Sequence, residues 1–185
     1  MIDLATLPFI QAKHYHVGRL EEIGLIAIHD MEAARTMKTA LHVAQWFAGP
    51  QAPEASCGYC VDAKTIVQCV HDEDTSWHAP HINANGIGIE LAGYYTETAD
   101  EWLDDYGLEE LDLAAQLVAA LCVKHSIPVR FVDAAGILAG EKGITTHAEA
   151  TKAYDVKGGH VDPGSGFPMA WFIDYIGNYM PSPSA

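Results

Sequence analysis

The sequence has few basic residues and no long apolar run. Lysine and arginine together number 10 against 25 aspartates and glutamates in 185 residues, which gives a formal net charge of −15 at pH 7. Because affinity for nucleic acid depends on lysine and arginine neutralising phosphates, this balance argues against a nucleic-acid partner. No apolar stretch reaches the roughly 18 residues that a membrane span needs, and the first residues lack the features of a secretion signal. We therefore expect no signal peptide and no membrane insertion.

Cysteine is also scarce, with four in the chain: Cys57, Cys60, Cys69 and Cys122. Three of them lie in apolar, strand-like sequence, so we expect buried, reduced thiols. The C-x-x-C spacing of Cys57 and Cys60 leaves a zinc or redox role open. The second C-x-x-C of a structural zinc site is missing, and this disfavours that alternative.

Repeats and low-complexity tracts are absent as well. Hydrophobic residues make up 49% of the chain and charged residues 19%, which is typical of a folded globule. The length suits one domain, predicted to cover residues 1–180. The last residues, PSPSA at 181–185, have the composition of the start of an interdomain linker, which predicts a further domain in a longer protein.

Hydrophobic periodicity divides the chain into strands and helices. Continuous or alternating apolar residues predict strands at 23–29 and 86–93 and a hairpin from 57–63 and 65–70. Apolar residues three and four apart predict helices at 32–48 and 108–125, with a short helix at 168–180. Because strands alternate with helices and the hairpin is antiparallel, we expect an α/β fold with a mixed central β-sheet flanked by helices.

Three side chains stand out among ten histidines and the acidic residues. His29 ends a buried strand where an apolar residue would pack better, His147 lies in GITTHAEA, and Asp162 lies in GGHVDPG. Two imidazoles and one carboxylate form a ligand set for Zn²⁺ and leave a fourth position for water. The three residues are far apart along the chain, so the fold must bring them together. Spacing alone is weak support, because ten histidines yield many such triples.

The motifs IAIHDME, SCGYCVD, SWHAP, N-x-N-GIGIEL, TTHAEA and GHVDPG occur in the order found in a known family. In this ordered set, which spans roughly residues 23 to 176, the chain resembles the type 2 N-acetylmuramoyl-L-alanine amidases, which are related to peptidoglycan recognition proteins and include many phage endolysins. The resemblance implies a groove with zinc bound by His29, His147 and Asp162. It also implies hydrolysis of the amide between N-acetylmuramic acid and L-alanine in bacterial peptidoglycan.

The same resemblance suggests three catalytic residues. Glu90 matches the glutamate that acts beside the zinc-bound water, and Tyr59 matches a tyrosine that lines the site in phage members. His160 falls where many relatives carry a lysine that stabilises the oxyanion. Each has a structural alternative: Glu90 could pair with a cation, Tyr59 could be a hydrogen-bonded core residue, and His160 could be a solvated loop residue.

Four residues between the hairpin and the strand at 86–93 are candidates for the substrate groove. Trp77 and His78 are expected to shape its wall. Asn83 and Asn85 either bind substrate amides or cap the turn into the strand.

Other functions remain open from the sequence. A non-catalytic peptidoglycan-binding module has the same fold, although such modules usually lack part of the ligand set. A zinc peptidase on an unrelated fold is the third alternative, and the absence of H-E-x-x-H counts against its common helical form. Within the amidases, a phage endolysin made in the host cytoplasm and acting on the cell wall fits the sequence, with a wall-binding or second catalytic domain in the full-length protein. A cytosolic amidase that recycles wall fragments has the same features.

Overall fold

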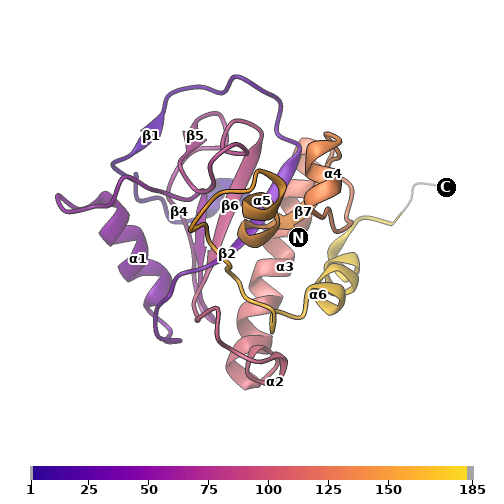
Figure 1. The fold of residues 1–185 in the computed structure, drawn as a ribbon. Coiled ribbons are helices and arrows are strands. Elements are labelled where there is room, and N and C mark those ends of the chain that lie inside the picture. The colour runs from indigo at the N-terminus through magenta and orange to yellow at the C-terminus, as the bar shows by residue number, and fades with distance from the viewer. Residues whose placement is uncertain (1, 183–185) are drawn as a thin grey trace.

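A five-stranded mixed β-sheet forms the centre of the molecule (Figure 1). The computed structural model describes residues 2–182, so most of the predicted linker at 181–185 lies outside the described residues. The strand order is β4-β3-β6-β2-β7, and all neighbours are parallel except the β3–β4 hairpin. The strands are β2 (Leu25–Asp30), β3 (Tyr59–Val61), β4 (Ile66–Gln68), β6 (Gly86–Leu91) and β7 (Gly143–Thr146). A separate antiparallel pair joins β1 (Tyr15–His16) and β5 (Thr75–Ser76).

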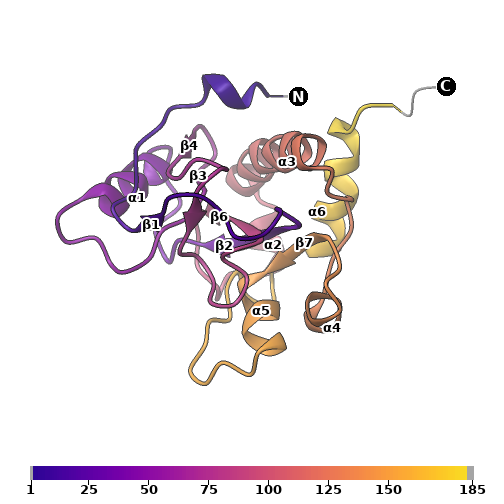
Figure 2. The ribbon, with the colours of Figure 1, turned by 90° about the horizontal axis from the view of Figure 1, so that it is seen from above.

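Helices cover both faces of this sheet (Figure 2). One face packs on α3 (Asp105–His125) and α6 (Met169–Ile176) through the largest hydrophobic cluster. The other face packs on α1 (Thr39–Ala48) near the hairpin and on α4 (Ala134–Leu138) and α5 (His147–Ala153) near β7. The remaining helical elements are α2 (Ala99–Trp102), η1 (Leu4–Thr6) and η2 (Gly177–Tyr179). No helix in the described part of the chain is long and apolar enough to cross a bilayer.

The predicted fold class and the predicted strands and hairpin are confirmed. The helix predicted at 32–48 is too long, because the chain forms turns before Thr39. Glu32 has a left-handed backbone conformation with φ of 47°, which a helix does not allow, and Met37 is half-exposed rather than buried. The last helix ends at Ile176 and continues as the 3₁₀ turn η2.

The register of the parallel strands places polar residues of three strands side by side. His29 in β2 pairs with Glu90 in β6, and Glu90 in turn pairs with Cys60 in β3. Paired residues in a sheet point to the same face, so these three side chains lie on the face that α1 and α5 cover. In β7 the last pair is Ile28 with Thr146, so His147 follows directly beside His29.

Candidate active site

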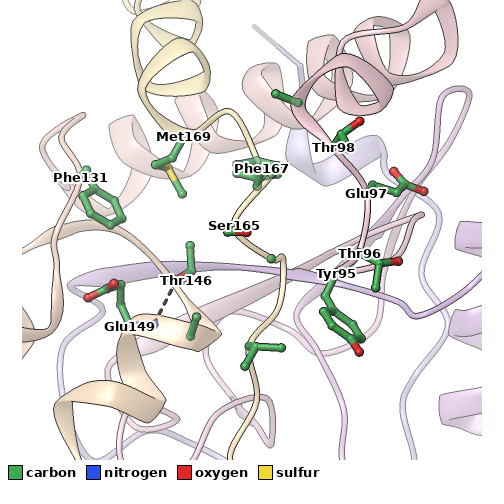
Figure 3. Close-up of a pocket in the computed structure, with 15 residues that line it drawn as sticks. Tyr95, Thr96, Glu97, Thr98, Phe131, Thr146, Glu149, Ser165, Phe167 and Met169 are labelled. Carbon is green, nitrogen blue, oxygen red and sulfur yellow. Dashed lines mark hydrogen bonds between the residues drawn. The ribbon is translucent and has the colours of Figure 1, made fainter.

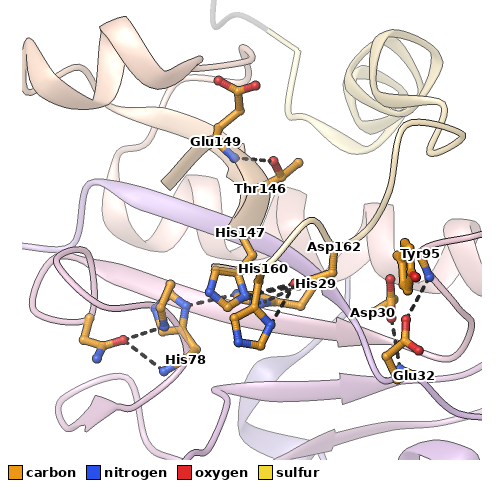
Figure 4. A network of polar contacts seen from close by, with 12 residues as sticks. His29, Asp30, Glu32, His78, Tyr95, Thr146, His147, Glu149, His160 and Asp162 are labelled. Atoms are coloured by element: carbon orange, nitrogen blue, oxygen red, sulfur yellow. Dashed lines mark hydrogen bonds and ion pairs between the residues drawn. The ribbon is translucent and has the colours of Figure 1, made fainter. Parts of the chain in front are cut away.

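His29, His147 and Asp162 meet at the carboxyl edge of the parallel strands (Figure 4). His29 is near the end of β2, His147 is the first residue of α5, and Asp162 lies in the loop after α5. The hydroxyl of Thr146 accepts a hydrogen bond from the backbone N–H of Glu149 and caps α5. All three side chains are buried. The fold thus assembles the ligand set that the sequence suggested.

The distances between the three ligand atoms are short and nearly equal. His29 Nδ1 lies 3.1 Å from His147 Nδ1 and 3.0 Å from Asp162 Oδ2. His147 Nδ1 lies 3.2 Å from Asp162 Oδ1 and 3.3 Å from Oδ2. In a tetrahedron with metal–ligand bonds of about 2.0 Å, ligand atoms are about 3.3 Å apart. The donor set and its spacing therefore fit a tetrahedral ion such as zinc with one open position.

The electrostatics of the group suit metal binding. Burial lowers the pKa of His29 and keeps its imidazole neutral at pH 7. Burial alone would raise the pKa of Asp162, but the close contacts of its carboxylate with the imidazoles of His147 and His29 outweigh burial and hold that pKa well below its usual range. Neutral imidazole and ionised carboxylate are the forms that coordinate a metal ion.

His78 supports His29 from behind. Its Nδ1 lies 3.1 Å from His29 Nε2, so His29 can turn Nδ1 toward the ligand group while Nε2 carries the ring proton. Asn83 Oδ1 accepts hydrogen bonds from the backbone N–H groups of His78 and Ala79, at 2.9 and 2.7 Å. Gly88 makes room for the imidazole, because a Cβ there would lie 2.6 Å from His78 Cβ. Asn83 thus caps this turn and also lines the cavity.

Glu90 lies beside His29 in the neighbouring strand. Its Oε2 is buried without a hydrogen-bond partner among the described residues. Burial, together with the nearby carboxylates of Asp162 and Asp30, raises the pKa of Glu90 well above its ordinary value. A carboxylate with a raised pKa and an unused oxygen is suited to accept a proton and return it.

His160 is at the rim of the group. Its ring stacks on His147 with centroids 4.1 Å apart, and its Nδ1 lies 3.3 Å from Asp162 Oδ1. The side chain is 68% exposed, so it is open to a molecule bound in the groove.

A cavity of about 840 Å³ opens over these residues. Trp77 and His78, the two residues expected to shape the wall of a substrate groove, line this cavity, and so does Trp46 of α1. Trp46 was not predicted as a site residue, because its place in an amphipathic helix does not reveal that half of its side chain stays exposed. The contact of His78 with His29 and the position of α1 beside the cavity could not be predicted, because both depend on contacts between distant segments of the chain.

A second cavity of about 910 Å³ adjoins the first and shares Tyr95 and Val161 with it (Figure 3). Phe131, Phe167 and Met169 give it an apolar lining. Among the described residues that line it there is no histidine or cysteine.

Two predicted site residues do not lie in the groove. Tyr59 is on the opposite face of the sheet, in the core that packs on α3, and its hydroxyl donates to Asp72 at 2.7 Å. The expectation that Tyr59 lines the site is therefore corrected in favour of the core alternative, since strand alternation turns it away from Cys60 and Glu90. Asn85 is not among the residues that line the cavity; its carbonyl accepts hydrogen bonds from the N–H groups of Gly24 and Leu25.

Solved structures with this fold are amidases and hydrolases. A selenomethionine derivative of AmpD has a TM-score of 0.66 at 20% identity, covering 95% of this chain and 98% of that one. The Staphylococcus aureus hydrolase AmiA in complex with its ligand has a TM-score of 0.69 at 17% identity, covering 96% and 84%. The endolysin amidase LysCS from Clostridium intestinale URNW has a TM-score of 0.57 at 14% identity, covering 95% and 97%.

A search of curated proteins found no match. The model of the N-acetylmuramoyl-L-alanine amidase family matches residues 19–165, which include the three candidate ligands and Glu90. The chain therefore belongs to the N-acetylmuramoyl-L-alanine amidase family.

Proposed function

We propose that this chain hydrolyses the amide between the lactyl group of N-acetylmuramic acid and L-alanine in bacterial peptidoglycan, with a zinc ion held by His29, His147 and Asp162. The observation that carries the proposal is the group of three candidate ligand atoms 3.0 to 3.3 Å apart, beside a carboxylate oxygen of Glu90 that has no partner in the described part of the chain. When bound, zinc lowers the pKa of water to about 7 and polarises a carbonyl oxygen.

Glu90 moves the proton in this proposal. Its half-buried carboxylate accepts a proton from the attacking water as the water oxygen bonds to the lactyl carbonyl carbon. The same carboxyl then donates that proton to the alanine nitrogen as the C–N bond breaks, which releases a free amino terminus. Because burial raises its pKa, the carboxylate is a stronger base than an exposed glutamate.

His160 faces the developing oxyanion. Its Nδ1 faces Asp162 Oδ1, so Nε2 is the ring nitrogen left for a substrate oxygen, to which the imidazolium form of His160 donates. A well-placed donor of this kind contributes about 3 kcal/mol to the transition state. The stack on His147 limits the positions of the ring and supports this orientation.

The groove suits a long substrate. Trp46 and Trp77 supply aromatic surface for sugar or peptide, and the cavity continues past Tyr95 and Val161 into the second one. We therefore place the chain with endolysin-like enzymes that cut the polymeric wall rather than with enzymes that recycle small fragments. Comparing rates on intact sacculi and on soluble muropeptides tests this choice, and faster cleavage of the soluble fragments would contradict it.

Purified peptidoglycan provides the test of the reaction itself. The expected result is release of amino-terminal alanine without new sugar reducing ends, lost after exhaustive chelation and restored by zinc. Reducing ends in place of amino termini would overturn the assigned bond. Wall binding without turnover, in protein that contains zinc, would instead favour the non-catalytic binding module.

A further inference from the structure

A second cluster of side chains of the kind that can bind a metal ion lies apart from the group of His29, His147 and Asp162. Cys57, Cys60 and Cys69 are completely buried beneath α1, and their sulfur atoms lie within 4.8 Å of one another. Cys57 Sγ is 3.4 Å from Cys60 Sγ, which is 3.7 Å from Cys69 Sγ. None of the three is a candidate ligand of the His29 group.

The backbone brings these thiols together from two segments. Cys57 lies just before β3, Cys60 is the middle residue of β3, and Cys69 directly follows β4 across the hairpin. The N–H of Cys69 donates to the carbonyl of Gly58 at 2.7 Å, and the N–H of Ala12 donates to the carbonyl of Cys69 at 2.8 Å. A Cβ at position 58 would lie 2.9 Å from Ile87 Cγ2, so the glycine lets this turn pack tightly against β6. The thiols therefore converge in a rigid part of the fold.

The spacing fits thiolate coordination. With metal–sulfur bonds of about 2.3 Å, the sulfurs of a tetrahedral site are about 3.8 Å apart. Apolar packing alone would not require three of the four cysteines to meet, and Cys122 shows the alternative, since it packs among hydrophobic residues against the other face of the sheet. Thiolates select soft ions such as copper(I) and zinc over magnesium or calcium.

We propose that Cys57, Cys60 and Cys69 together bind one thiophilic metal ion, separate from the catalytic group. Among the described residues no histidine or carboxylate joins this cluster, so the three sulfurs are the protein's whole donor set there. The ion would connect the β3–β4 hairpin to the segment before it and stabilise the edge of the sheet next to Glu90. This inference does not depend on the proposed amidase activity.

The test uses the purified chain carrying His147→Ala, which weakens binding at the other site, in a reductant without thiols and without oxygen. Cadmium(II) is the probe, because thiolate-to-cadmium charge transfer absorbs in the ultraviolet and histidine or carboxylate ligation gives no such band. We expect the band to saturate at one equivalent and the melting temperature to rise with cadmium. Parallel titrations with zinc(II) and copper(I) identify the preferred ion by competition.

Matched variants locate the ion. Adding Cys60→Ala should abolish the band, whereas Cys122→Ala, which also removes a buried thiol, should leave it unchanged. Circular dichroism checks that each variant is folded. The rise in melting temperature that cadmium causes in the chain with all four cysteines is a second measurement, and it needs no cysteine variant. The proposal is overturned if no band and no melting shift appear, or if counting free thiols after denaturation without reductant reveals a disulfide within the cluster.

Discussion

Replacing Glu90 by glutamine should reduce amide hydrolysis by about 10²- to 10⁴-fold, the range for losing one general acid–base group. This corresponds to about 3 to 5 kcal/mol of transition-state stabilisation. The substitution keeps the size of the side chain, which lies beside His29 in the strand register and has a buried Oε2 without a partner among the described residues. The assay is release of amino-terminal alanine from purified peptidoglycan at a fixed metal content.

The same substitution, Glu90→Gln, should not lower the stability of the folded protein at neutral pH. Burial raises the pKa of Glu90 well above its ordinary value of 4.5, so the folded state disfavours the ionised carboxylate. Above pH 4.5 the unfolded chain ionises this group freely, and the wild-type protein loses stability as the pH rises. In the chelated protein, Glu90→Gln should therefore melt no lower than wild type at pH 7, and any advantage should shrink toward pH 4.

Glu110→Gln is the matched control for this experiment. Glu110 is a buried carboxyl that, like Glu90, has a raised pKa and an Oε2 without a partner among the described residues. It belongs to α3, and its Oε1 accepts a hydrogen bond from the N–H of Ala92. Its substitution should leave turnover within about threefold of wild type, as expected for a site outside the groove. If Glu90→Gln retains more than a tenth of wild-type activity with its metal bound, the proposed proton transfer is refuted.

Three other changes test separate parts of the molecule. His147→Ala should lower the metal content by one ion per chain and abolish turnover, as measured by elemental analysis and peptide release; unchanged metal content would contradict the ligand assignment. His160→Ala should reduce turnover about 10- to 100-fold. His160→Lys should retain most of the wild-type turnover, because either a cationic or a neutral donor can stabilise an oxyanion. Equal activity of the two variants would argue against oxyanion stabilisation by His160. Hydrogen bonds from His125, Lys124 and Tyr59 outweigh burial and lower the pKa of Asp72 to about 2. The ionised form of Asp72 therefore contributes about 2 kcal/mol to the free energy of unfolding above pH 4, and this contribution is lost as the pH falls from about 4 to 2. Asp72→Asn should melt about 4 to 8 °C lower than wild type at pH 7 and at the same temperature in acid. A difference in melting temperature that stays constant across that pH range would exclude this linkage.

Much of the sheet and of the ligand group could be predicted, because each rests on a local pattern. The apolar run before His29 marks a buried strand whatever its neighbours are. A histidine at the end of such a strand is a conspicuous exception, and the structure puts it against His147 and Asp162. The family resemblance supplied the partners, since spacing alone could not choose among ten histidines.

The remaining parts depend on pairings that no local pattern contains. Which face Tyr59 occupies is decided by the register of β3 against β6, where its neighbour Cys60 pairs with Glu90. The support of His29 by His78 depends on a loop that crosses β6 above Gly88. The predicted start of helix α1 at residue 32 was wrong, because the apolar spacing continues through turns before Thr39 that are not helical.

Strand register also explains why the catalytic residues can act together. Side chains alternate between the two faces of a strand, so a shift of β6 by one residue relative to β2 would turn Glu90 away from His29 and into the α3 core. Ile87, Ile89 and Leu91 of β6 oppose such a shift, because each would then leave that core for the groove side. The apolar residues of these strands thus do more than stabilise the fold: by fixing the register, they keep the carboxylate of Glu90 beside the candidate metal ligands.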